Sequence, residues 1–324
     1  MTTPKFDHID FIKQIVSFSP RQHTGEIKTA DFLENYLKKR KIDFFVQKFK
    51  TTVPVEKKVI LKADDKNIPC KSTCFVSGKI PNKENLISSL CKDFQYDEQI
   101  GYNINFNPSC KSISCACFYN YPAVAIAGKD VNKILNAKKV EGFVEIKPTT
   151  YTARNILVGN KTSPKVICFA HYDSVLTGAW DNASGVSTIM ASIIQHPETL
   201  ENALYVFTAN EEMSYDKDPV YWCKGFRAFE EKNLAIIEKA KRIIVVDGVG
   251  ISPSYWMDKY ENLKSTIFFR QLKKFMPKIR RLGASTSKFA QYLYHSELDT
   301  IKQIKKKHLI QTCHELHKEI SKIE

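Results

Sequence analysis

The chain has 324 residues, of which 43% are apolar and 26% are charged, and its formal net charge is +14. This composition is typical of a folded globular protein and excludes a disordered chain. No apolar run approaches the roughly 20 residues that span a bilayer, and the first residues lack the apolar core of a secretory signal. We therefore expect a cytoplasmic protein with no membrane partner.

The positive charge comes from lysines that are spread along the chain. They form no stripe interleaved with aromatic residues, which favours a solvated basic surface over a nucleic-acid partner. The nine cysteines show no paired Cys-x-x-Cys spacing, which argues against a structural zinc site. We expect reduced, mostly buried thiols. The oligomeric state is left open.

Helical periodicity predicts helices over residues 7–18 and 27–40, and an alternating pattern predicts a strand over 42–49. Between about 51 and 148, short β-prone pieces are separated by prolines and glycines, with one helical stretch at 129–138. We interpret this region as a β-rich insertion, a lid or side domain.

From residue 149 onward, apolar strands alternate with helices. This alternation predicts an α/β fold with a mostly parallel mixed sheet that helices flank on both faces. Residues 1–50 and 149–324 would form this domain, with 51–148 inserted into it. The strands are expected at 166–170, 203–209, 243–246 and near 289–294, and the helices at 186–194, 226–240, 261–275 and 309–323.

Acidic and histidine side chains lie at the ends of these strands. They are His171 and Asp173 after the first strand, Asp181 before the next helix, Glu211 and Glu212 after the second strand, Asp247 after the third, and His295 after the last. The carboxyl ends of parallel strands meet at one edge of a sheet, so these side chains should converge. Five carboxylates there would repel one another unless divalent cations neutralised them. The pattern therefore predicts a two-metal hydrolytic site.

Position suggests a role for each metal ligand. Asp181 begins a helix beside small residues, and we expect it to be shared by both metals. His171 and Asp247 would complete the ligands of one metal. Glu212 and His295 would complete those of the other.

Two acids are left without a metal. Glu211 is expected to act as general base and then as general acid. Asp173 is expected to accept a hydrogen bond from His171 and to fix its tautomer. The last helix also carries three histidines without His-Glu-x-x-His spacing, which we expect to be solvated or to pack against the helix: His308, His314 and His317.

Five short motifs carry a resemblance to a known family. They are His-Tyr-Asp-Ser (171–174), Trp-Asp-Asn-Ala-Ser-Gly-Val (180–186), Asn-Glu-Glu (210–212), Val-Asp-Gly-Val-Gly (246–250) and Tyr-His-Ser-Glu-Leu-Asp-Thr (294–300). These motifs resemble those of the co-catalytic di-zinc aminopeptidases, which include bacterial leucyl aminopeptidases, aminopeptidase Y and glutamate carboxypeptidase. The resemblance covers 150–324 well and 1–50 more loosely. It implies a zinc-exopeptidase-like fold, two zinc ions per chain on the five ligands above, and Glu211 as the catalytic acid and base.

The chain departs from this family at two places. A Gly-Ser pair usually follows the Glu-Glu pair closely, but here Gly225 comes only after the long segment Met213–Lys224, which we expect to rim the substrate pocket. Glutaminyl cyclases, a single-zinc branch of the same fold, carry a comparable insertion. Thr286-Ser287-Lys288 also replaces the Ser-Asp-His often seen before the last ligand. The stretch around 121–128 resembles a shortened protease-associated domain.

The sequence therefore predicts a zinc exopeptidase, in first place an aminopeptidase that acts on peptides with a metal-bridging water activated by Glu211. One alternative is an acyltransferase with one zinc, like glutaminyl cyclase. Another is an inactive binding homologue that kept the fold and lost its metals. The choice between an amino and a carboxyl terminus, the side-chain preference and the physiological metal stay open.

Overall fold

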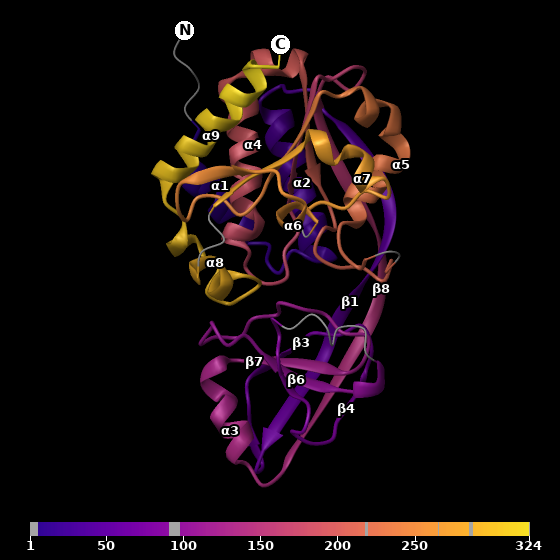
Figure 1. Ribbon diagram of the computed structural model, residues 1–324, viewed down its shortest axis with the longest axis vertical. Coiled ribbons are helices and arrows are strands. Elements are labelled where there is room, and N and C mark those ends of the chain that lie inside the picture. Colours follow the sequence, from indigo (N-terminus) through magenta and orange to yellow (C-terminus); the bar gives the residue numbers. More distant parts are fainter. Residues whose placement is uncertain (1–5, 91–97, 218–219, 265, 285–287, 324) are drawn as a thin grey trace. The chain divides into compact units, whose positions relative to one another are not determined.

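The computed structural model describes residues 6–90, 98–217, 220–264, 266–284 and 288–323. It divides into two compact units. The first unit contains 1–51, 151–285 and 300–324, and the second contains 52–150 and 286–299. The chain passes between them within two long strands, β1 (Phe45–Ala63) and β8 (Val140–Gly159) (Figure 1). The domain boundaries expected from the sequence stay a prediction.

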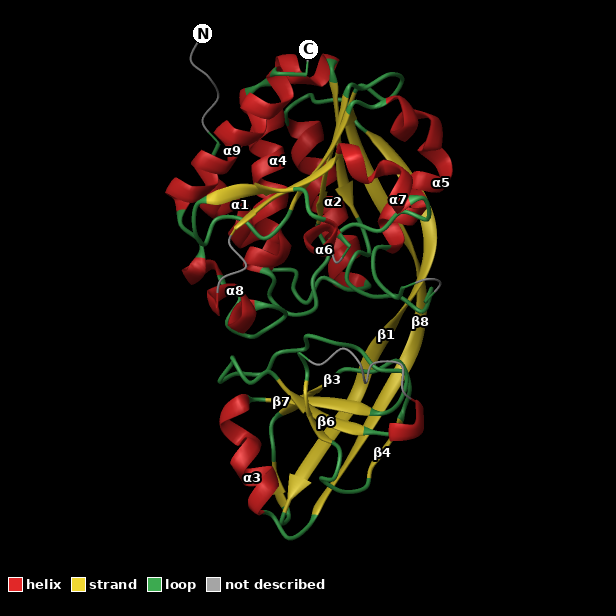
Figure 2. Ribbon diagram, in the orientation of Figure 1, coloured by secondary structure: helices red, strands yellow, loops and turns green. Residues whose placement is uncertain are grey.

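The sheet of the first unit has β9 (Val166–His171) at its centre. This strand pairs in parallel with β10 (Ala203–Thr208) on one side and with β11 (Arg242–Val246) on the other. β11 is also parallel to β13 (Ile279–Ala284). Antiparallel strands complete the sheet, because β8 pairs with β10 and β12 (Ser254–Met257) pairs with β13. Figure 2 shows the strands in yellow and the helices that flank them in red. The expected α/β fold with a mixed sheet and flanking helices is confirmed, and the parallel pairs lie at the centre of the sheet.

Helices cover this sheet on both faces. The longer ones are α1 (His8–Val16), α2 (Thr24–Lys39), α4 (Ser184–Gln195), α5 (Lys224–Lys239) and α9 (Lys306–Ser321). On one face α4 packs against β9, α1 and α9. The hydroxyl of Tyr205, on β10, points to this face, where it is 3.1 Å from Ser192 Oγ on α4. None of the described helices is long and apolar enough to cross a bilayer.

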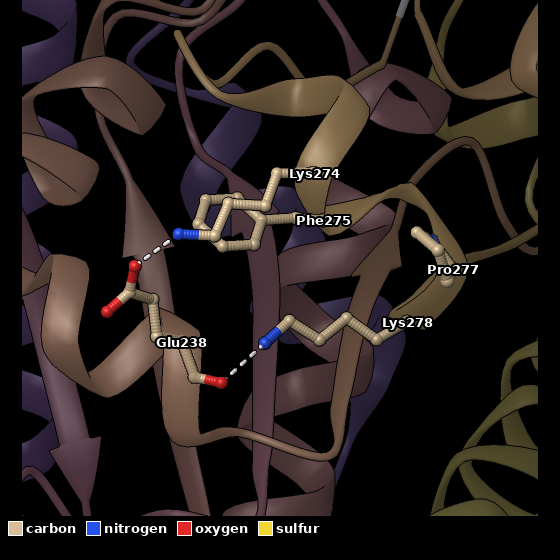
Figure 3. Close-up of a pocket in the computed structure, with 5 residues that line it drawn as sticks. All are labelled: Glu238, Lys274, Phe275, Pro277 and Lys278. Atoms are coloured by element: carbon tan, nitrogen blue, oxygen red, sulfur yellow. Dashed lines mark hydrogen bonds and ion pairs between the residues drawn. The ribbon is translucent and has the colours of Figure 1, made fainter.

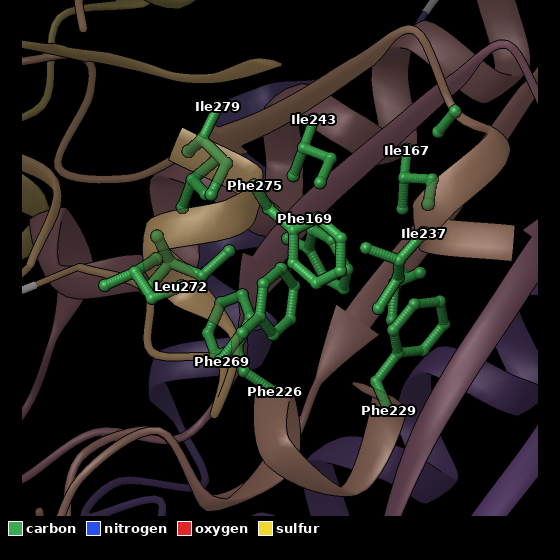
Figure 4. Packing of buried hydrophobic residues seen from close by; sticks show 14 of the residues in the cluster. Ile167, Phe169, Phe226, Phe229, Ile237, Ile243, Phe269, Leu272, Phe275 and Ile279 are labelled. Atoms are coloured by element: carbon green, nitrogen blue, oxygen red, sulfur yellow. The ribbon is translucent and has the colours of Figure 1, made fainter. Parts of the chain in front are cut away.

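The opposite face carries an aromatic core. Phe169 on β9 lies 5.1 Å, between ring centroids, from both Phe226 and Phe229 on α5, and 6.0 Å from Phe269 (Figure 4). All four rings are fully buried. Alternate residues of the neighbouring strands join them, because side chains of a strand alternate between its faces. These strand residues are Ile167, Leu204, Val206, Ile243, Val245 and Ile279.

The carboxyl end of α5 is capped by a lysine from a distant segment. Lys278 Nζ donates hydrogen bonds to the backbone carbonyls of Ile237, Glu238 and Ala240, the latter two at 2.9 and 3.0 Å (Figure 3). Its charge also complements the helix dipole at that end. Lys274 forms an ion pair with the Glu238 carboxylate beside it. The side chains that line this small pocket thus have structural roles, because they form a helix cap and an ion pair.

The predicted helix over 261–275 is wrong. The structure has two short helices, α6 (Tyr260–Leu263) and α7 (Leu272–Phe275). Between them the carboxylate of Glu230 accepts the backbone N–H groups of 270–271 at 2.5 and 2.9 Å. In a continuous helix these two N–H groups would donate to backbone carbonyls of the preceding turn. Here the Glu230 carboxylate, from α5, is their acceptor instead.

The predicted strand near 289–294 is also wrong. Helix α8 (Lys288–Leu293) occupies this position, and its six residues do not alternate between apolar and polar as a half-buried strand would. The sequence did not reveal β12, and it also did not reveal β13 (Ile279–Ala284). Two charged residues, Arg280 and Arg281, interrupt its apolar pattern, and each finds an acidic partner, Glu319 and Asp247 respectively.

The second unit has its own sheet and core. Its strands follow the order β3 (Cys70–Ser72), β7 (Ala123–Ile126), β6 (Asn103–Phe106) and β5 (Leu86–Ser88), with β6 parallel to β5 and β7. Two short strands, β2 (Lys66–Asn67) and β4 (Gly78–Ile80), pair with β1 and β8. The helical stretch expected at 129–138 is α3 (Val131–Asn136).

The expectations for the prolines of this region and for the cysteines of the chain have different outcomes. Proline was expected to separate short strands, but β1 continues through Pro54, and β8 continues through Pro148. Strong pairing along the rest of each strand outweighs one missing donor. The cysteines behave as expected: the eight in the described part of the chain are free thiols, and all but the partly exposed Cys70 are buried.

Candidate metal centre

The predicted site residues of the first unit lie at the carboxyl edge of its parallel strands. His171 is the last residue of β9 and is paired with Thr208, the last of β10. Asp247 follows β11 directly, and Asp181 lies just before α4. The register of the parallel strands therefore brings residues distant in sequence to one edge, as predicted.

Imidazole and carboxylate atoms converge there. His171 Nε2 is 3.1 Å from Asp181 Oδ1 and 3.7 Å from Asp247 Oδ1. The ligand atoms of these three residues all lie within 4.8 Å of one another, and so do those of His171, Glu211 and Glu212. All five side chains are buried. The structure thus groups four predicted site residues around the imidazole of a fifth, His171.

Asp173 joins the ends of two strands. Its Oδ1 accepts the backbone N–H of Glu211 and its Oδ2 that of Glu212, both at 2.9 Å. Oδ1 is also 3.4 Å from His171 Nδ1, and the expected role of Asp173 in fixing the imidazole tautomer stays a prediction. Burial by itself raises the pKa of Asp173, but the His171 ring and these N–H donors outweigh it and lower the pKa below its usual value. Asp173 therefore acts as a fixed anion behind the cluster.

A second buried carboxylate holds the same turn, and the sequence did not reveal it. Glu26 Oε2, on α2, accepts the backbone N–H of Asn210 at 3.0 Å. Thr51 donates to Asn210 Oδ1 at 2.6 Å. Asn210 has a φ of 49°, so the turn needs such support. Burial and then the nearby Asp173 charge raise the pKa of Glu26 well above its usual value.

The segment between His171 and Asp181 is held by a fully buried arginine. The Arg21 guanidinium donates to the backbone carbonyls of Tyr172, Thr177 and Gly178 at 2.7, 2.6 and 2.8 Å. No motif near Arg21 in the sequence indicates this role. Arg21 lies 151 positions before Tyr172, the nearest residue of this segment that its guanidinium holds, so sequence patterns could not have identified it.

Asn182 ties the Asp181 turn to the end of β11. Its Oδ1 accepts the N–H of Gly185 at 3.0 Å, and its Nδ2 donates to the Val246 carbonyl at 2.9 Å. A Cβ on Gly185 would lie 2.4 Å from both Asn182 Oδ1 and the Val246 carbonyl oxygen. The small residues after Asp181 thus permit the close approach that the sequence predicted.

Glu211 is surrounded by polar groups in a buried site. Cys223 Sγ, at the start of α5, is 3.2 Å from Glu211 Oε1, and the Cys223 N–H donates to the Glu211 carbonyl. Burial raises the pKa of Glu211 well above its usual value; His171 opposes this, and Glu212 and Asp173 add to it. Cys223, like Glu26, was not identified from the sequence as part of the site.

The long segment after Glu212 folds back on this region. The Ser214 N–H donates to the Tyr221 carbonyl at 2.7 Å, and Asp216 pairs with Lys224 at 2.5 Å. Tyr221 is buried, and Trp222 packs against the aromatic core. The predicted contribution of this segment to a substrate pocket stays a prediction. Asp218, which the sequence placed in it, lies outside the described residues.

His295 belongs to the second unit. Its Nδ1 is 3.2 Å from the Cys115 carbonyl, and the Tyr294 ring stacks on it at 3.9 Å. Its predicted role as a metal ligand stays a prediction. Thr286 and Ser287, which replace the usual residues before this ligand, lie outside the described part of the chain.

Comparison with known proteins was made against this geometry. The sequence model of peptidase family M28 matches residues 155–282. This M28 match spans the segment that contains His171, Asp181, Glu212 and Asp247, and it confirms the resemblance to zinc peptidases drawn from the motifs. It supports a metallopeptidase. No curated protein sequence matches the chain.

Solved structures share the fold. BSAP, a zinc aminopeptidase from Bacillus subtilis, is 16% identical with a TM-score of 0.66, over 97% of this chain and 94% of that chain. An aminopeptidase from Aneurinibacillus sp. strain AM-1 is 14% identical with a TM-score of 0.56, over 94% and 91% of the two chains. Glutaminyl cyclase from Porphyromonas gingivalis is 15% identical with a TM-score of 0.53, over 97% and 96%. At these identities the likeness establishes the fold.

The residues present fit the zinc that the M28 match implies. Burial disfavours the charged form of His171, but Glu211, Asp173 and the other acids outweigh this and raise its pKa well above the usual value. That outcome indicates a strongly negative site. Arg281, 3.3 Å from Asp247 Oδ2, offsets one of the acids. An imidazole among carboxylates with excess negative charge is the donor set that zinc takes.

Proposed function

We propose that this chain is a two-zinc aminopeptidase that releases N-terminal residues from peptides. One observation carries the proposal: His171, Asp181, Asp247 and Glu212 converge at the carboxyl edge of the sheet with Glu211 beside them. The fold likeness to zinc aminopeptidases supports the choice of reaction.

The side chains of the site would have different roles in peptide hydrolysis. When bound, zinc would polarise the scissile carbonyl and make water more acidic. Glu211 would take the proton of the attacking water and pass it to the leaving amine. Asp173 would keep His171 in one tautomer and hold the backbone of the Glu211–Glu212 turn, since it accepts both N–H groups. Asp181 and Asp247 would hold the metal near His171.

A second function has specific support. The long segment Met213–Lys224 resembles an insertion of glutaminyl cyclases, and the fold is shared with the Porphyromonas gingivalis enzyme of that name. In this alternative the site would hold one zinc ion, and Glu211 would move a proton during cyclisation of an N-terminal glutamine.

The two functions differ in product and in metal content. Aminoacyl p-nitroanilides and peptides that begin with glutamine should be offered to the zinc-loaded protein, and bound metal counted after dialysis. Release of free amino acids with about two zinc ions bound at the carboxyl edge of the sheet supports the aminopeptidase. Cyclised glutamine with about one ion bound at that edge would replace it by the alternative.

The role of Glu211 has its own test. Glu211→Gln keeps the shape of the side chain but removes the base, so kcat should fall by roughly 10²–10⁴-fold. The matched control is Glu231→Gln, which changes an exposed glutamate of α5 and should leave kcat unchanged. If Glu211→Gln turned over substrate at the wild-type rate, another group would have to be the base.

A further inference from the structure

A second group of metal-ligand side chains lies away from the catalytic edge. His196 caps the carboxyl end of α4, Glu198 lies in the short helix that follows (Pro197–Glu201), and His317 lies on α9. Ligand atoms of the three lie within 4.8 Å of one another. The 12 residues of α4 separate this group from the Asp181 turn by about 18 Å, so the two clusters are distinct.

Two elements are joined at this point. The His196 and His317 rings stack with centroids 3.7 Å apart and planes 12° apart, and His196 Nδ1 is 3.3 Å from Glu198 Oε1. α9 packs against both α4 and the short helix that carries Glu198 (Figure 1). The group therefore links the last helix of the chain to the end of α4.

An orphaned ring nitrogen points to a missing ligand. His317 Nδ1 is buried and has no hydrogen-bond partner among the described residues. Buried polar atoms are normally paired, so an unpaired one needs an explanation. A neutral imidazole with its proton on Nε2 leaves a lone pair on Nδ1, which is the form that binds metals.

The surroundings favour a cation. The free carbonyls at the carboxyl end of α4 carry partial negative charge, and Glu198 adds a full one. His314, one turn before His317 on α9, adds a third imidazole near His196.

We propose that His196, Glu198 and His317 form a second, non-catalytic site for a transition-metal ion such as zinc or copper, which fastens α9 to the end of α4. Two imidazoles and a carboxylate suit these borderline ions better than calcium or magnesium. The lone pairs of the stacked rings lie in two nearly parallel planes, so one ring must turn about its Cβ–Cγ bond for both to reach one ion. Binding thus opens the stack.

The test counts metal with matched variants. Wild type, His317→Gln and His308→Gln are dialysed against zinc, and bound metal per chain is measured. His308 is also on α9 but lies outside the cluster, so its variant should hold as much zinc as wild type. His317→Gln should hold about one ion fewer. Glu198→Gln changes an exposed side chain and should not disturb the core. It should lower the affinity for the zinc ion of this second site at least tenfold.

Copper gives a second signal. One equivalent of Cu²⁺ added to the zinc-loaded protein should replace the zinc of this site, because copper binds such ligands more tightly than zinc. Its electron-spin resonance spectrum should show coupling to two imidazole nitrogens in wild type and to one in His317→Gln. Equal zinc and copper binding by wild type and His317→Gln would overturn the proposal. So would an equal loss in His308→Gln, which would indicate unspecific surface binding. Only differences between variants count, so the result does not depend on how many ions the catalytic edge holds.

Discussion

Single buried residues behind the metal centre determine how its ligands are presented. Asp173 and Glu26 together accept three consecutive backbone N–H groups, those of 210–212. The side chains of Glu211 and Glu212 are therefore fixed from behind by two carboxylates. This arrangement leaves their own carboxylates directed at the cluster around His171.

Replacing Asp173 by Asn should damage metal binding more than folding. The amide keeps one oxygen, but its NH₂ group would face the N–H of Glu211 or Glu212, and the anion beside His171 would be lost. We expect zinc affinity to fall about 10- to 100-fold, as for other residues that support a metal ligand. Dialysis against a zinc buffer series measures this. Asp10→Asn, at an exposed ion pair on α1, is the control and should bind zinc as wild type does.

At the scale of elements, α1, α4 and α9 meet around a buried histidine. His8 Nδ1 is 2.9 Å from Ser187 Oγ on α4, and its Nε2 is 3.8 Å from Cys313 Sγ on α9. Burial first, and then Lys306, lower the pKa of His8 to about 4. The packing of these three helices therefore requires a neutral ring.

This requirement makes stability depend on pH. The unfolded chain binds a proton at His8 near pH 6.5, and the folded chain does so only near pH 4, so stability is full above pH 6.5 and falls as the pH drops to 4. The loss is of the order of 3 kcal/mol. Urea unfolding of wild type and His8→Asn across this range checks it. Parallel curves for the two proteins would show that His8 contributes no such dependence.

The other face of the sheet depends on aromatic packing between β9 and α5. Phe169→Ala would remove the ring that contacts Phe226, Phe229 and Phe269, and should lower the free energy of unfolding by about 3–5 kcal/mol. Phe45→Ala is the control: this ring is 42% exposed, and its removal should cost far less. Thermal melting of the two variants measures the difference. Similar losses would mean that the core tolerates the cavity.

At the scale of the whole chain, sequence patterns predict what local chemistry encodes. His171, Asp181 and Asp247 could be placed because each follows an apolar strand or begins a helix. Arg21 and Glu26 could not, because they act on backbone groups more than 150 positions away. A long-range contact also explains the missed break between α6 and α7, where the Glu230 carboxylate accepts the N–H groups of 270–271. β13 was missed because charged residues interrupt its apolar pattern. The partner that makes Arg281 acceptable there, Asp247, lies far away in the sequence.

The cluster of buried acids around His171 should make the melting temperature of the protein depend on bound metal. Without a cation, the buried acids around His171 repel one another, so chelation should lower the melting temperature. Asp181→Asn removes one of these charges. The metal-free variant should therefore melt at a higher temperature than metal-free wild type.

With zinc present, the order of the two proteins should reverse. The variant lacks a carboxylate that would bind the metal, so zinc should raise its melting temperature less than that of wild type. The difference between the two proteins should grow with the concentration of free zinc, as mass action requires. Asp258→Asn, at an exposed acid, should follow wild type under both conditions. Scanning calorimetry with chelator and with zinc distinguishes the outcomes. If Asp181→Asn melted below wild type in both, the acids would be held by hydrogen bonds that need no cation, and the metal centre would have to be abandoned.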